Sequence, residues 1–142
     1  MSLIIFSCSN GHEKEEYEKA VILKTIVLPK IINETSGLEI LDNRFITHND
    51  SGGDPLLYMF NEGGEIIQTI EIINQSNNDW EDITADEDYI FIADTGNNFG
   101  YRDNLNILKV KTNDFSIDGK INIAYKDQQI FVPRSKHKYD AE

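Results

Sequence analysis

The sequence predicts an all-β fold, and two observations lead to that prediction. The apolar residues are mostly Ile, Leu, Phe and Tyr, in short runs broken by Asn, Asp and Gly, which favours strands over long helices. The second observation is that one pattern of apolar runs and turns occurs twice along the chain. With 142 residues and 39% hydrophobic content, the chain can build one ordinary core.

Each copy of the repeated pattern has an apolar opening, a turn, a second apolar run and a polar end. The copies span residues 36–53 and 81–98, and Asp140-Ala141-Glu142 resembles the opening of a third. A period of 40-odd residues built from short strands is typical of the blades of a β-propeller. We therefore expect about two four-stranded antiparallel blades and the start of another.

The spacing inside the two copies is nearly the same. Leu38 to Asp50 is 12 residues, and Ile83 to Asp94 is 11 residues. One additional turn residue in the first copy would account for the difference. On this alignment the first copy ends at Asp50 and the second at Asp94.

The propeller portion is expected over residues 20–142, with blade 1 at about 34–74, blade 2 at about 79–132 and blade 3 from 139. Residues 20–32 are rich in β-branched residues and contain Pro29, which indicates an edge strand that would close the ring. The predicted strands are 37–41, 44–48, 56–60 and 66–72 in blade 1, and 83–85, 89–93, 105–110 and 121–125 in blade 2, with a short apolar run at 129–132.

Two blades cannot close into a ring, because the smallest common propellers need about four. Open blades would also expose an apolar face and an unpaired sheet edge. We expect the natural protein to continue beyond Glu142, with pairing to another chain as the alternative.

The first 19 residues predict a truncated lipoprotein signal followed by a disordered tether. A short apolar run and a small residue precede Cys8, the only cysteine, which would be the lipidation site. Residues 9–19 are polar and charged. A chance apolar start with a lone thiol is the alternative. No other segment approaches the ~20 apolar residues of a spanning helix, so we expect membrane attachment through a lipid anchor alone.

The net charge of -12 argues against a nucleic-acid partner, because binding phosphate needs a basic face. An acidic surface suits cationic ligands or metal ions. The simpler interpretation, which we favour for most of these carboxylates, is that they solvate the surface.

Polar residues gather at the ends of the predicted strands, and the repeat aligns Ser36, Glu81 and Glu142 as one ring position near a central channel. Converging carboxylates repel one another unless a cation or a hydrogen-bond donor compensates, and oxygen ligands of this kind suit Ca²⁺. The candidate metal ligands are Glu81, Asp82, Glu142, Asp50 and Asp94. The candidate ligand-binding or channel-lining residues are Ser36, His48, Asn49, Trp80 and Asn97.

Structural roles compete with these assignments. Asp50 and Asp94 lie in good turn sequences, where Asp caps backbone amides, and we favour that role for both. Glu81 and Asp82 are balanced between the two roles. Trp80 is expected to pack between blades, with ligand stacking as the alternative.

We assign no catalytic residue. The chain contains none of the nucleophile-elbow, zinc-binding, redox or phosphate-loop motifs. His48 could act as a base, but a lone His at a strand end is more often structural.

Five stretches resemble a family of bacterial extracytoplasmic six-bladed propellers, often described only as lipoproteins. They are residues 34–41, 47–53, 79–83, 93–110 and 139–142. The wider group is similar to NHL-repeat, TolB-like, gluconolactonase-like and SdiA-regulated propellers. In the last two groups, polar residues at the channel mouth can hold Ca²⁺, so the resemblance implies such a site. It also implies further blades after the Asp-Ala-Glu motif.

The sequence thus predicts the N-terminal part of a propeller lipoprotein in the bacterial cell envelope, in the periplasm or at the outer membrane. The expected function is a non-enzymatic binding or scaffold module for an unidentified protein or small molecule. Its cofactor would be Ca²⁺ at the channel. The alternative is a hydrolase of lactonase or phosphoesterase type that uses Ca²⁺ as a Lewis acid.

Overall fold

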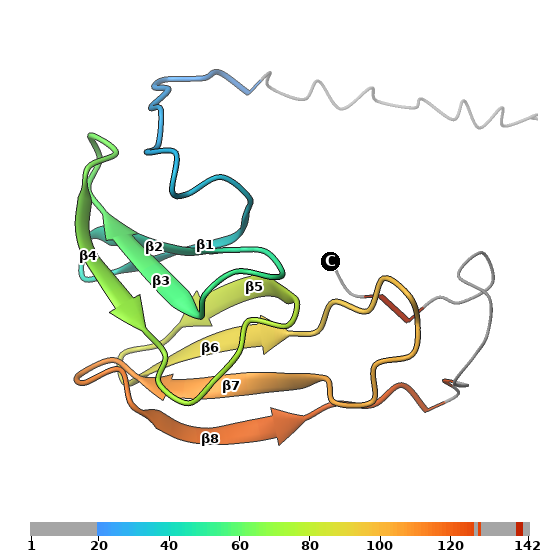
Figure 1. Ribbon diagram of the computed structural model, residues 1–142. Coiled ribbons are helices and arrows are strands. Elements are labelled where there is room, and N and C mark those ends of the chain that lie inside the picture. Colours follow the sequence, from blue (N-terminus) through green and yellow to red (C-terminus); the bar gives the residue numbers. More distant parts are fainter. Residues whose placement is uncertain (1–19, 127, 129–138, 141–142) are drawn as a thin grey trace, which may run out of the picture.

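The computed structural model describes residues 20–126, 128, 139 and 140, and it is all-β over that range. Eight strands form two four-stranded antiparallel sheets, which pack against each other (Figure 1). The described residues include no helix that could cross a membrane. Cys8, Glu142 and the apolar run at 129–132 lie outside the described residues.

Each sheet is a simple meander in which every strand pairs with the next one along the chain. Sheet A consists of β1 (Thr35–Leu41), β2 (Arg44–Asn49), β3 (Leu56–Phe60) and β4 (Ile66–Glu71). Sheet B consists of β5 (Trp80–Ala85), β6 (Tyr89–Asp94), β7 (Asn106–Lys111) and β8 (Ile117–Asn122).

Local turn chemistry explains the tight connections in sheet A. Asp42 and Asn43 both have positive φ, 50° and 59°, which a two-residue hairpin between right-twisted strands requires. Between β3 and β4, the side chain of Asn61 accepts hydrogen bonds from the amides of Gly63 and Glu65. These turns set the register of both hairpins.

The predicted position of the last strand was wrong. The chain turns back earlier, because Phe115 adopts a φ of 56° and the amide of Lys111 donates to the carbonyl of Ser116. Strand β8 therefore begins at Ile117, whose side chain packs against the core, and ends at Asn122. The predicted strand at 121–125 shares only its first two residues with β8.

The two sheets repeat one another in register and in their irregularities. In the first hairpin of each sheet the register shifts between Thr35 and Gly37, and 45 residues later between Trp80 and Asp82. The third and fourth strands also share a shift, at 59/60 in sheet A and at 109/110 in sheet B. Shared bulges are strong evidence of one structural unit used twice.

This register corrects the alignment of the strand ends. The hairpin turns are equal in length, so no additional turn residue is needed. Asn49 pairs with Thr35 as Asp94 pairs with Trp80, and Asn49 is therefore the counterpart of Asp94. Asp50 lies one residue further along the loop.

The main core lies between the two sheets. Apolar side chains on alternate strand positions of each sheet meet there, which is the expected way to bury one face of a sheet. Sheet A contributes Leu41, Ile46, Leu57, Met59 and Ile70, the linker contributes Ile72, and sheet B contributes Trp80, Ile83, Ile90, Ile92, Leu108 and Val110.

The segment before β1 covers the other face of sheet A. Ile26, Leu28 and Ile32 pack against Tyr58 and Phe60, beside stacked aromatic rings of the same face. No described residue of 20–32 belongs to a strand, so the predicted edge strand is absent from this structure. Figure 1 shows the segment in blue above sheet A.

The sheets approach most closely where β1 crosses β5. A Cβ on Gly37 would lie 2.7 Å from the amide nitrogen of Ile83 and 3.0 Å from the Cα of Asp82. Only glycine permits this contact between two backbones.

We predict that Gly37→Ala lowers the free energy of unfolding by about 1–3 kcal/mol, because the sheets must separate to admit the methyl group. Gly119→Ala in β8 is the matched control, since its Cβ would have no atom within 4 Å. Urea unfolding of both variants checks this, and equal midpoints would contradict the account.

His48 and Trp80 form a buried contact between the sheets. Both are fully buried, and their rings meet edge to face with centroids 5.6 Å apart. Nδ1 of His48 donates to the carbonyl oxygen of Asn49 at 3.0 Å. Burial lowers the pKa of His48 below its ordinary 6.5, although nearby carbonyl groups and the charges of Asp82 and Asp50 oppose the shift.

We predict that protonation of His48 destabilises the fold. Because the folded pKa is lowered, stability is full above about pH 6.5 and falls as the pH drops toward the folded pKa. The melting temperature of the chain should therefore decrease more between pH 7 and pH 5 than that of His48→Gln. Asp79 has a shift of opposite sign, but both proteins contain it. Equal slopes would rule out this role for His48.

Candidate functional site

Three carboxylates converge where the two sheets meet at one end. Asp50 follows β2 of sheet A, Asp79 precedes β5 of sheet B, and Glu81 lies within β5. One ligand oxygen from each residue lies within 4.8 Å of the other two. Asp79 is buried, while Asp50 and Glu81 are half-buried. We call these three residues the acidic cluster.

Backbone contacts hold Asp50 in place. Its amide donates to the carbonyl oxygen of Glu34 at 2.7 Å, and the Asn77 side chain donates to its carbonyl oxygen at 2.6 Å. Asn77 also donates to the carbonyl of Asn49 and accepts from the amide of Trp80. The linker between the sheets therefore ties Asp50 to the start of β5.

Asp94 holds three residues of the site in place. Its Oδ1 accepts from the amide of Asp79 at 3.1 Å and from Nη2 of Arg102 at 2.8 Å. Its Oδ2 accepts from the side chain of Asn78 at 2.8 Å. Asp94 is only 2% exposed. Its buried charge is neutralised by Arg102, and both of its oxygens accept hydrogen bonds, as a buried carboxylate requires.

Gly96 makes room for the acidic cluster. A Cβ at this position would overlap the carboxylates of Asp79 and Glu81. The amide of Gly96 donates to the carbonyl of Asp79, which holds the loop after β6 against the cluster. Any larger residue here would push the two carboxylates out of their positions.

The electrostatics of the cluster favour a compensating positive charge. The pKa of Asp79 is raised above its ordinary 3.8, first by burial and then by the charge of Asp50. A hydrogen bond from Asn98 and the charge of Arg102 oppose the shift, while the charge of Asp140 adds to it. Asp79 is therefore costly to ionise unless a cation is present.

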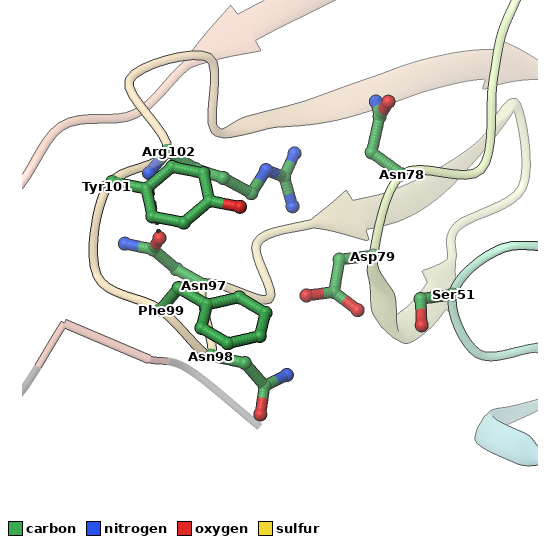
Figure 2. Close-up of a pocket in the computed structure, with 8 residues that line it drawn as sticks. All are labelled: Ser51, Asn78, Asp79, Asn97, Asn98, Phe99, Tyr101 and Arg102. Carbon is green, nitrogen blue, oxygen red and sulfur yellow. Dashed lines mark hydrogen bonds between the residues drawn. The ribbon is translucent and has the colours of Figure 1, made fainter. Parts of the chain in front are cut away.

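A pocket adjoins the cluster, with a volume of about 350 Å³. Asp79 and Ser51 line one side of it, and the rings of Phe99 and Tyr101 line the other, as Figure 2 shows. Asn98 and Arg102 also line the pocket, together with Asn78 and Asn97. The pocket thus joins a carboxylate to an aromatic surface.

The predicted metal ligands separate into three groups. Asp50 and Glu81 belong to the acidic cluster. Asp94 is instead paired with Arg102, and exposed Asp82 accepts from the amide of Ile83. Glu142 lies outside the described residues.

The predicted channel-lining residues also differ in their positions. Ser36 is exposed, whereas His48 and Trp80 are fully buried between the sheets. The side chain of Asn49 donates to the carbonyl of Ile31. Asn97 lines the pocket but is 1% exposed, and it holds the loop by donating to the carbonyl of Tyr139 and the carboxylate of Asp140.

Sequence reasoning missed Asp79 and Arg102. Asp79 belongs to a polar run that was noticed, but Glu81 and Asp82 were chosen because they are adjacent. Strict alternation could not have found Asp79, because it precedes β5 and the register shifts between Trp80 and Asp82. Nothing in the sequence alone pairs Arg102 with Asp94.

The chain matches no protein-family model, and no curated protein is significantly similar to it.

Proposed function

We propose that the two sheets are consecutive blades of a β-propeller. The support is their shared register, because sheet A and sheet B carry the same bulges 45 to 50 residues apart. Residue 46 in sheet A corresponds to residue 91 in sheet B, and 57 corresponds to 107. Such an arrangement places one repeat on the next in the same orientation.

The faces of the sheets fit this arrangement. Ile46 and Leu57 are fully buried against sheet B. Their counterparts Phe91 and Ile107 are half-buried on the opposite face of sheet B, next to Ile121, which is 52% exposed. By repetition, this second face would receive a third sheet.

We infer that the acidic cluster binds a divalent cation, and that the cation is Ca²⁺. The convergence of Asp50, Asp79 and Glu81 within 4.8 Å is the observation that carries the inference. A cation would offset the two effects that raise the pKa of Asp79, which are first its burial and then the charge of Asp50. All three side chains offer the hard oxygen ligands that Ca²⁺ uses, and its flexible coordination leaves positions for water or a ligand.

The function we propose is therefore a Ca²⁺-holding binding or scaffold module of the bacterial cell envelope. The proposed envelope location and lipid anchor rest on Cys8 in the sequence. The two sheets together position the cation, because Asp50 comes from one sheet and Glu81 from the other. A ligand in the adjoining pocket would lie next to Asp79 of the acidic cluster, because Asp79 lines that pocket.

We predict that the metal-free chain binds one Ca²⁺ in isothermal titration at pH 7, and that Asp79→Asn weakens the affinity at least about tenfold by removing a buried charged ligand. Asp54→Asn is the matched control, because Asp54 is exposed and lies in the same loop as Asp50 but outside the cluster. Its affinity should be unchanged.

Gly96→Ala gives a second test that retains every carboxylate. It should weaken Ca²⁺ binding by displacing Asp79 and Glu81. Absence of a saturable heat, or equal affinity in Asp79→Asn and Asp54→Asn, would overturn the proposed site.

A Ca²⁺-dependent hydrolase is the second candidate, and the pocket beside the cluster favours it. A cation on Asp79 could polarise an ester or phosphate oxygen in that pocket. This candidate requires turnover of an ester, lactone or phosphoester substrate that stops when Ca²⁺ is removed, whereas the binding module requires none.

A further inference from the structure

Two aromatic side chains are exposed beside the acidic cluster. Phe99 and Tyr101 are 58% and 56% exposed, and their rings stack with centroids 5.7 Å apart and planes inclined by 20°. Both lie in the loop between β6 and β7. Exposed aromatic surface beside a pocket is a common mark of a binding site.

Hydrogen bonds fix the loop that carries these rings. The amide of Gly100 donates to the carbonyl of Asn97 at 2.6 Å, and the amide of Arg102 donates to the Asn97 side chain at 2.9 Å. The side chain of Gln128 donates to the carbonyls of both Gly100 and Arg102. The aromatic pair is therefore preorganised, which reduces the entropy lost when a ligand binds.

The two charged residues that line the pocket, Arg102 and Asp79, differ in their contacts. Arg102 is already engaged, because its guanidinium contacts the carboxylate of Asp94 and the carbonyl of Gly96. Asp79 faces the pocket opposite the two rings (Figure 2). A ligand in this pocket thus meets two aromatic rings and one carboxylate.

We propose that this pocket binds an alkylammonium group, with the cation lying between the aromatic pair and Asp79. The face of an aromatic ring attracts a cation through its quadrupole, most strongly where water is displaced, and quaternary ammonium groups are recognised in this way. Asn98 and Ser51 add polar partners for a hydroxyl or amide near the cation. The volume of about 350 Å³ accommodates a ligand of the size of choline.

The alkylammonium pocket adjoins the proposed Ca²⁺ site, so the two cations should compete. Both cations use the charge of Asp79, so each should weaken the binding of the other, and the coupling must be reciprocal. The aromatic pair contributes only to the organic cation.

The proposal is tested by titrating the full chain with choline at low ionic strength without Ca²⁺ and recording NMR spectra at each addition. The probe for charge is 3,3-dimethylbutan-1-ol, which has the same shape as choline but no charge. We expect choline to shift the amide signals of residues 97–102 along a saturable curve. The neutral analogue should bind at least about fivefold more weakly. Equal binding of the two, or no saturation with choline, overturns the proposal.

Leucine variants separate cation–π attraction from apolar contact. Phe99→Leu and Tyr101→Leu retain apolar surface but remove the ring, and each should weaken choline binding about threefold to fivefold. Phe91→Leu, on the outer face of sheet B, is the matched control and should have no effect. Unchanged affinity in both loop variants contradicts the proposal.

The same titration with Nα-acetyl-lysine amide distinguishes a small quaternary ammonium ligand from a lysine side chain of a partner. Tighter binding of choline supports a small quaternary ligand, and tighter binding of the lysine derivative supports a protein partner; both retain the alkylammonium class. Choline binding without Ca²⁺ binding would overturn only the proposed function. Ca²⁺ binding without choline binding would overturn only this inference.

Discussion

The backbones of β1 and β5 lie against each other at Gly37, whose missing side chain allows the main chain of Asp82 and Ile83 to come close. This crossing brings the end of β2 next to the start of β5. Asp50 therefore lies beside Asp79, although the two residues belong to different sheets. Separating the sheets would dismantle the core and the acidic cluster together.

The surroundings of the cluster show how two buried carboxylates can have opposite roles. Asp94 is satisfied by Arg102, Asn78 and a backbone amide, so it supports the loop. Asp79 accepts a hydrogen bond from the side chain of Asn98 and faces the charge of Asp50. The first carboxylate stabilises the fold, and the second is placed where a cation would bind.

The strands and hairpins of sheet A could be predicted from the sequence, because apolar runs and turn residues are local signals. The strand Leu56–Phe60 was predicted with its observed bounds. Strand β8 was placed too late, since the turn at Phe115 depends on a left-handed conformation that a phenylalanine seldom adopts. The repeat unit was also visible, although the loop residue Asp50 was aligned with Asp94 in place of Asn49.

The site was only partly predictable for a physical reason. Glu81 stood out because the repeat aligned it with Ser36 and Glu142 at one ring position. Asp50 stood out because it ends the first copy, although a turn-capping role was favoured for it. Asp94 carried an equal sequence signal, but its charge is neutralised by Arg102, a tertiary contact that no local pattern encodes. The role of Gly96 likewise depends on side chains that arrive from a different strand.

If carboxylates from two sheets act as one cation site, the loops that carry them must respond to Ca²⁺ together. A Ca²⁺ titration of the ¹⁵N-labelled chain measures this, with the amides of Ser51 and Gly96 as reporters for the loops of sheets A and B. Both signals should shift along one saturable curve with a common midpoint. Movement confined to one loop, or a linear drift without saturation, would mean that the two sheets do not share a cation.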